Sequence, residues 1–134
     1  MIIDYNLQFS DAQSVTADAA STNIIDLGSD RDIGVGEEMK IALNFDVAMG
    51  GSSPTLAVLV QTDDNSSFSS ATTVLTSRSI AAAALGDTLV LGLPDTNERY
   101  VRLYYDVGGS SPTMTVSASV VKDAQQSTSY PDAT

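Results

Sequence analysis

The stretch that decides the fold covers residues 38–62 and reads EMKIALNFDVAMGGSSPTLAVLVQT. On both sides of its glycines, apolar residues recur at every second position. This period is typical of a strand with one face in a core, because successive side chains of a strand point to opposite faces. Gly50 to Pro54 has the composition of a turn, so we predict a long hairpin. The alternating apolar positions are Met39, Ile41, Leu43, Phe45 and Val47, then Leu56, Val58 and Val60.

The same turn chemistry returns 58 residues later in the chain. Residues 105–113 read YDVGGSSPT and repeat the types found at residues 45–47 and 50–55. Apolar alternation flanks this second copy as well, which predicts a second hairpin. The repeat indicates pseudo-symmetric halves, or equivalent ends of two packed sheets. The flanking alternating positions are Val101, Leu103, Tyr105 and Val107, then Met114, Val116, Ala118 and Val120.

The rest of the chain predicts short strands over residues 23–27, 72–76 and 88–93, with one helical turn over residues 79–85. Residues 11–22 are small and polar and are interpreted as a loop. Short strands with frequent turns and almost no helix favour an all-β fold: an antiparallel β-sandwich, jelly-roll-like, with extended N- and C-terminal segments. The expected division is an N-terminal arm and loop (1–22), a β-sandwich domain (23–122) and a C-terminal tail (123–134).

Composition excludes several function classes. The 134 residues contain no cysteine, histidine or tryptophan, and six basic residues against 17 acidic ones give a net charge of −11. Without histidine or cysteine there is no Ser-His-Asp or Cys-His nucleophile, no zinc finger and no thiolate cluster. A strongly acidic chain is repelled by phosphate backbones, which disfavours nucleic-acid binding. We expect a protein that is not an enzyme and holds no cofactor or metal.

The sequence gives no sign of membrane insertion or export. No apolar run approaches the roughly 20 residues that a membrane-spanning helix needs. The first residues, Met1 to Asp4, have no basic segment of the kind that begins a signal peptide. We expect synthesis in a cytoplasm and no membrane partner.

Two groups of carboxylates invite functional hypotheses. Asp46 and Asp106 occupy matching places in the repeated segments. A pair of carboxylates is what glycoside hydrolysis requires, so the two residues are candidates for that reaction. Aspartates beside glycine turns, however, more often accept hydrogen bonds from backbone amides. Residues 63–66 read DDNS, which offers oxygen ligands of the kind that calcium prefers. The same four residues are more typical of an exposed hairpin loop made polar by Asx turns.

Two surfaces have the composition of an interface. Tyr100, Arg102 and Tyr104 alternate with apolar residues and share one strand face, and tyrosine and arginine are enriched where proteins bind one another. The alternative is a second sheet face whose side-chain stems cover a small core. The second surface is the apolar N-terminus, which either adds a strand to its own sheet or inserts into a partner. Its residues are Ile2, Ile3, Tyr5, Leu7 and Phe9.

Seven segments of the chain carry a further resemblance. They are MIID (1–4), SDAQSVT (10–16), AASTNIIDLG (19–28), VQTDDN (60–65), FSSATT (68–73), LGLP (91–94) and ERYVRLYY (98–105). Together these segments resemble the capsid cement (decoration) proteins of short-tailed bacteriophages. The similarity covers about residues 1–123 in order and contains no catalytic motif.

The resemblance implies a jelly-roll-like sandwich that assembles as a homodimer or another small homo-oligomer on the outer surface of a virion. It implies that the protein binds the major capsid protein, bridges neighbouring subunits and stabilises the expanded, DNA-filled shell. Two other classes stay open from the residues alone. One is a carbohydrate-binding β-sandwich module or virion surface adhesin. The other is a small hydrolase that uses Asp46 and Asp106.

Overall fold

Strands form almost all the regular structure of the protein. The computed structural model describes residues 2–29, 36–84 and 86–124. All strand pairings in this part are antiparallel, which confirms the predicted all-β, sandwich-like fold. The elements are the 3-10 turn η1 (Tyr5–Leu7) and the strands β1 (Gln8–Val15), β2 (Ala19–Ala20), β3 (Ile25–Asp26), β4 (Lys40–Asp63), β5 (Thr72–Thr76), β6 (Ile80–Ala81), β7 (Thr88–Gly92) and β8 (Tyr100–Val121).

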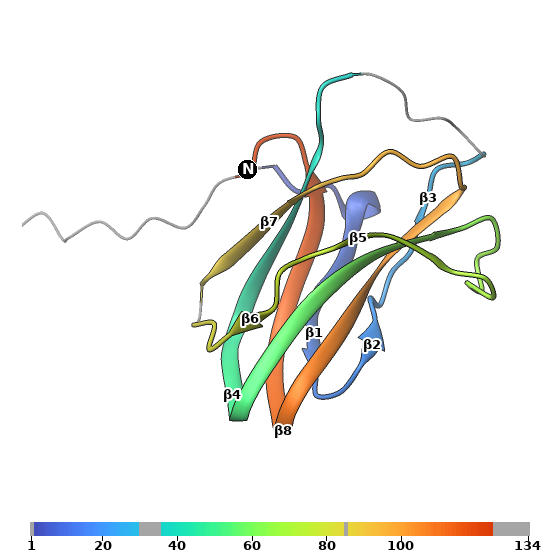
Figure 1. Ribbon diagram of the computed structural model, residues 1–134. Helices are drawn as coiled ribbons and strands as arrows, with labels where there is room; N and C mark the ends of the chain where they lie inside the picture. The colour runs from blue at the N-terminus through green and yellow to red at the C-terminus, as the bar shows by residue number, and fades with distance from the viewer. Residues whose placement is uncertain (1, 30–35, 85, 125–134) are drawn as a thin grey trace, which may run out of the picture.

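The two long strands β4 and β8 pair with each other from end to end. Lys40 lies opposite Val121 at one end of this ladder, and Asp63 lies opposite Tyr100 at the other. Both strands bend sharply midway, at the bottom of Figure 1, where the glycine-rich segments are. The two predicted hairpins are therefore wrong. The segments on either side of Gly50–Pro54 pair with β8 and with other strands, and not with each other.

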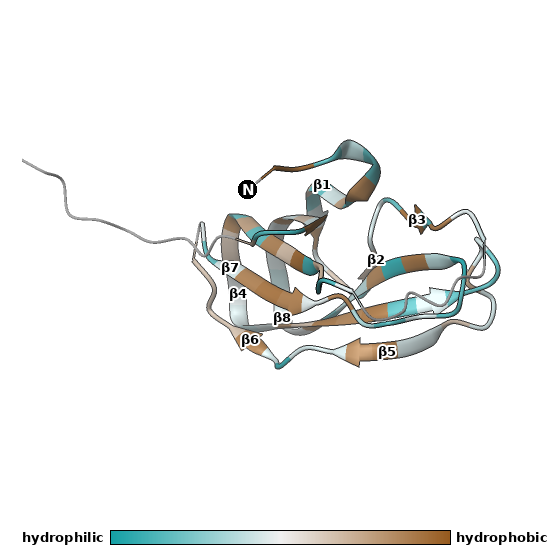
Figure 2. Ribbon diagram, turned by 90° about the horizontal axis from the view of Figure 1, so that it is seen from above, coloured by the Kyte–Doolittle hydropathy of each residue, from teal (hydrophilic) through white to brown (hydrophobic). Residues whose placement is uncertain are grey.

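The bends turn one sheet into a sandwich of two layers. The first layer has the order β1, second half of β8, first half of β4, β7. In the second layer, β2 and β3 pair with the first half of β8, and this half of β8 pairs with the second half of β4. Strands β5 and β6 pair with the other edge of the second half of β4. Figure 2 shows this arrangement from above, with β7 in one layer and β5 and β6 in the other.

The core lies between the layers and uses the alternating residues that the sequence marks. Burial of apolar surface is the main driving force for such packing, at roughly 25 cal/mol per Å². Tyr105 is the largest of the completely buried side chains, and its hydroxyl lies 2.7 Å from the Ser10 hydroxyl of β1, which joins the two layers. The other large, fully buried core residues are Phe9, Val15, Ile41, Leu43, Phe45, Leu56, Val58, Val60, Leu103, Met114 and Val116.

The repeated GGSSP segments adopt the same backbone conformation at the two bends. Gly51 and Gly109 have φ of 104° and 103°, and Ser53 and Ser111 both have φ of 51°. The two segments lie against each other in the ladder, with Ser52 opposite Ser110. The predicted internal repeat is therefore structural: β4 and β8 are related halves that meet at the bends.

Three local expectations are wrong. The helical turn expected over residues 79–85 is not formed, because Ile80 and Ala81 pair with β4 as β6. The loop expected over residues 11–22 contains most of β1 and all of β2, because pairing with β8 makes strands of residues whose own strand propensity is low. The N-terminal arm is consequently shorter than residues 1–22. Most of the expected tail, residues 123–134, lies outside the described residues.

In the part of the chain that the structure describes, no helix has the length and apolar character needed to cross a membrane.

Candidate interaction surface

Two tyrosines and an arginine at the start of β8 lie on the outer face of the second layer. Tyr100, Arg102 and Tyr104 are half-buried, whereas the residues between them are buried in the core, as the alternation predicts. Across the ladder, Leu59 of β4 lies opposite Tyr104 and Gln61 lies opposite Arg102. We call these five residues the Arg/Tyr face.

A loop adds an aromatic ring to this face. Phe68, in the loop between β4 and β5, places its ring 4.2 Å from the Arg102 guanidinium carbon and is only 7% exposed. The Arg102 Nε donates a hydrogen bond of 2.9 Å to Gln61 Oε1. A guanidinium over an aromatic ring is attracted by the ring quadrupole, so these contacts hold the positive charge in a fixed orientation. Sequence analysis missed Phe68 because a single aromatic residue in a polar loop has no periodicity.

The carboxylate of Asp63 shapes that loop. Its two oxygens each accept a backbone hydrogen bond of 2.8 Å, one from Asn65 and one from Ser70, and the residue is buried. The loop is therefore closed by Asx-type hydrogen bonds, the alternative to a calcium site over residues 63–66. Among the described residues, no group of three or more acidic side chains is placed to hold a metal ion.

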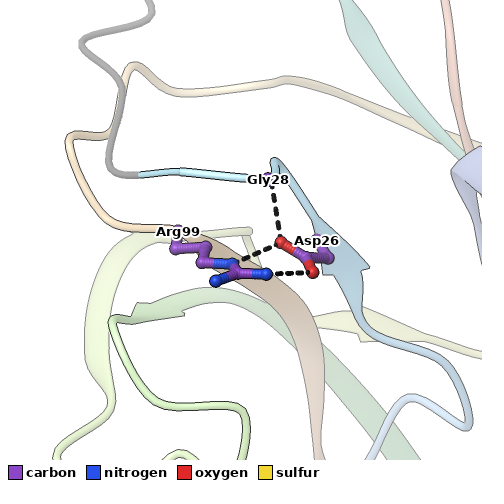
Figure 3. Close-up of polar contacts among 3 residues, drawn as sticks. All are labelled: Asp26, Gly28 and Arg99. Atoms are coloured by element: carbon purple, nitrogen blue, oxygen red, sulfur yellow. Dashed lines mark hydrogen bonds and ion pairs between the residues drawn. The ribbon is translucent and has the colours of Figure 1, made fainter.

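An ion pair fixes the end of the Arg/Tyr face next to β3 (Figure 3). Arg99 donates to both carboxylate oxygens of Asp26, with distances of 2.7 and 2.8 Å, and the Gly28 amide donates to the same carboxylate at 2.8 Å. The Arg99 hydrogen bond, helped by that of Gly28, lowers the pKa of Asp26 to about 2. Arg99 also lies 5.0 Å from the centre of the Tyr100 ring. The pair thus connects β3 to β8 and orients the first tyrosine of the face.

The apolar N-terminal residues divide between surface and core. Ile2 is 93% exposed, Ile3 50% and Tyr5 78%, although Leu7 is half-buried against the core. Phe9 is completely buried. The prediction that it belongs to an interface is therefore wrong, and Phe9 is a core residue. The exposed part of the apolar N-terminus is therefore residues 2–5, which we call the N-terminal segment.

An apolar cleft of about 690 Å³ opens at the end of the sandwich away from the bends, and Leu7 is among the residues that line it. Its floor is made of core and half-buried side chains, and Glu37, Glu38 and Asp95 line it as well. Lys122 and Lys40 form exposed ion pairs with Glu37 and Glu38, at 2.9 and 3.0 Å. The apolar residues that line the cleft are Leu7, Phe9, Ile25, Leu27, Met39, Leu93, Pro94 and Val101.

Asp46 and Asp106, the carboxylates considered for hydrolysis, lie in different layers. Asp46 follows Phe45 in the first layer and accepts a hydrogen bond from the Ser117 hydroxyl. Asp106 lies opposite Ala57 in the second layer. Both residues are exposed. Neither side chain lines any of the described cavities.

The fold and these surfaces define an acidic, all-β sandwich protein whose distinctive features are exposed apolar and arginine-tyrosine surfaces. Comparison with protein families gives a match to the Bbp16 family over residues 9–125. The chain therefore belongs to the Bbp16 family, whose name is phage-related. No curated protein matches the chain.

Proposed function

We propose that this protein is a capsid cement protein. It binds the outside of a phage capsid, bridges neighbouring copies of the major capsid protein and stabilises the expanded, DNA-filled shell. The protein acts in the virion after synthesis in the host cytoplasm, and the role requires no catalytic step, cofactor, nucleic acid or membrane.

The observation that carries the proposal is the exposure of the N-terminal segment. Ile2, Ile3 and Tyr5 lie outside the core of the sandwich, and their side chains are half to almost fully exposed. Burying an isoleucine that is otherwise in water contributes about 1.5–3 kcal/mol. Such a segment therefore favours a partner surface. Membership in a phage-related family supports a phage component as that partner, and the capsid is the surface that we propose.

Charge and multiplicity support the same role. A net charge of −11 suits a protein on the outside of a shell better than one among packed DNA, because like charges repel. A ligand that binds only the intact shell stabilises it by mass action, by about 2.7 kcal/mol per site at 100 times the Kd. Because many copies bind one particle, their stabilising free energies add up over the whole shell.

The test uses particles stripped of the protein and then decorated again. Decorated particles should release their DNA at a higher temperature than stripped ones, as followed with a DNA-binding dye. The double variant Ile2→Asp, Ile3→Asp should fail to bind and to stabilise. Val47→Asp is the matched control, because Val47 is 53% exposed at the bend, far along the chain from the N-terminal segment. Equal release temperatures for stripped and decorated particles would refute the proposal.

The carbohydrate-binding alternative predicts binding to a glycan array, with or without calcium. Stacking on a sugar needs an exposed ring face. Phe68 is almost completely covered and Arg99 lies over Tyr100, so the Arg/Tyr face offers few free rings. We therefore favour a protein partner.

A further inference from the structure

The guanidinium of Arg102 is held in place by three neighbouring side chains. Its Nε donates a hydrogen bond of 2.9 Å to Gln61 Oε1, and its carbon lies 4.2 Å from the centre of the Phe68 ring and 6.0 Å from that of Tyr104. Neither Nη group of Arg102 has a hydrogen-bond partner among the residues that the structure describes. Arg102 therefore presents unused N–H donors at the end of a fixed, half-buried side chain.

Within the described part of the chain, no carboxylate pairs with Arg102, although the protein has a net charge of −11. The acidic residues at this end of the sheet are used elsewhere. Asp63 bonds to two amides of its own loop, and Glu98 accepts a hydrogen bond from a buried threonine hydroxyl. Asp26 is held by Arg99 (Figure 3). The positive charge of Arg102 is therefore available to a counter-charge from outside the chain.

The chemistry of a guanidinium defines the counter-charge that fits it. Its N–H groups point in parallel and can donate to both oxygens of one carboxylate, which a lysine cannot do. A phosphate would fit the same donors, but nucleic acids and membranes present phosphates in large numbers, and these repel a chain of charge −11. A protein surface can present a single carboxylate among neutral groups. An aspartate or glutamate of a protein partner therefore suits Arg102 best.

The surroundings of Arg102 favour a contact from which water is excluded. Leu59 and Tyr104 lie opposite each other in the ladder, two positions along from the pair of Gln61 and Arg102, and all four residues are half-buried. Apolar area around an arginine and a tyrosine is typical of the centre of a protein interface, where a few such residues dominate the binding free energy. An ion pair formed at such a place is screened by salt much less than an exposed pair.

We propose that the Arg/Tyr face binds an aspartate or glutamate side chain of the shell protein, with the Nη groups of Arg102 donating to its carboxylate. Leu59 and Tyr104 pack around this ion pair and cover it from water. The proposal names the partner group for a second surface of the cement protein, beside the apolar N-terminal segment. To that extent it rests on the proposed function.

The first test measures how Arg102 variants bind stripped particles. Arg102→Gln should raise the Kd about 30-fold or more, as expected when one partner of a desolvated ion pair is lost. Arg102→Lys keeps the charge but cannot donate to both oxygens in parallel, so it should restore only part of the affinity. The matched control is Arg78→Gln, which removes the same charge from an exposed arginine outside the Arg/Tyr face and should change the Kd less than about twofold. Far-UV circular dichroism checks that each variant is folded.

Salt separates a direct contact from a general effect of charge. The Debye length falls from about 14 Å at about 0.05 M salt to about 4 Å at about 0.5 M, so the long-range effect of one charge is lost over this range. The ratio of the Kd of Arg102→Gln to that of the wild type should persist at the higher salt concentration. A ratio that falls to one there would overturn the proposal, because Arg102 would then act only through the net charge.

The second test uses the purified protein without particles. The Arg102 Nε proton is followed by NMR while the peptide acetyl-Leu-Glu-Leu-amide is added, and its signal should shift until the site is saturated. The peptide acetyl-Leu-Gln-Leu-amide has the same shape without the charge and should have no effect. The Arg99 Nε proton is the internal control and should not shift, because it is already bonded to Asp26.

The outcomes distinguish this proposal from the cement role. Particle binding that is unaffected by Arg102→Gln would overturn the proposal and leave the cement role standing. A wild type that does not bind particles would refute the cement role. In that case a shift that requires the glutamate peptide would keep Arg102 as a carboxylate site, and the lack of a shift would overturn this site as well. If Arg102→Gln instead separated a wild-type oligomer into single chains, the carboxylate would come from a second copy, which would overturn its assignment to the shell protein.

Discussion

Replacing Gly51 with alanine should destabilise the protein far more than the same change at Gly86. Both glycines have positive φ, 104° and 84°, so both substitutions strain the backbone. They differ in surroundings. A Cβ on Gly51 would lie 2.5 Å from the Ser111 carbonyl oxygen and 2.9 Å from that of Ser110, whereas a Cβ on Gly86 meets nothing described within 4 Å.

The magnitude follows from two contributions. A non-glycine residue at positive φ costs about 1–2 kcal/mol, partly offset by the lower entropy of the unfolded alanine chain, which leaves about 1 kcal/mol for Gly86→Ala. At Gly51 the added methyl also presses on backbone atoms of β8 that cannot rotate away. Overpacking of this kind costs a further 1–3 kcal/mol, for about 3 kcal/mol in total.

Thermal and urea unfolding followed by far-UV circular dichroism, at one protein concentration, measures both variants. For a domain of this length we expect the Tm to fall by roughly 10 °C for Gly51→Ala and by roughly 4 °C for Gly86→Ala. Gly109→Ala should match Gly51→Ala, because its Cβ would lie 2.7 Å from the Ser53 carbonyl oxygen. Equal losses at Gly51 and Gly86 would refute the claim that the close approach of β4 and β8 at the bends requires glycine.

Three further predictions concern single side chains. Tyr105→Phe removes a buried hydroxyl hydrogen bond and should cost about 1 kcal/mol in urea unfolding. Burial raises the pKa of Tyr105 to about 12, so wild-type stability should fall between pH 10 and 12 more steeply than that of the variant. The hydrogen bond from Arg99 lowers the pKa of Asp26 to about 2. The ion pair therefore stabilises the fold above about pH 4, and this contribution is lost as the pH falls towards 2. In Asp26→Asn the free energy of unfolding should depend less on pH in this range. Phe68→Ala should cost about 3 kcal/mol and free the Arg102 side chain, seen as faster exchange of its Nε proton by NMR.

Each of these has an outcome that would contradict it. An unchanged slope of stability above pH 10 in Tyr105→Phe would show that another group titrates there. Identical acid unfolding of wild type and Asp26→Asn would mean that the ion pair contributes nothing measurable. If Phe68→Ala left the exchange of the Arg102 proton unaltered, Gln61 alone would be holding the guanidinium.

The sequence alone determined the strand faces. Apolar residues at every second position assign the inward and outward faces of a strand, as at Ile41, Leu43 and Phe45 and again at Val101 and Leu103. This assignment does not depend on which strand pairs with it, because the pleat is a local property of the backbone. The same pattern correctly set Tyr100, Arg102 and Tyr104 on the outer face. The absence of histidine and cysteine limited the available chemistry before any contact was considered.

Only the tertiary structure decided how those strands are connected. Gly51 and Gly109 at positive φ serve a chain reversal or a bend equally well, and the choice depends on whether the flanking segments pair with each other or with a strand about 60 residues away. Phe9 and Ile2 belong to one apolar N-terminus, yet one is buried and the other exposed, because the pairing of β1 with β8 takes in the first and stops short of the second. Long-range pairing is a property of the whole chain, so no local pattern of residues contains it.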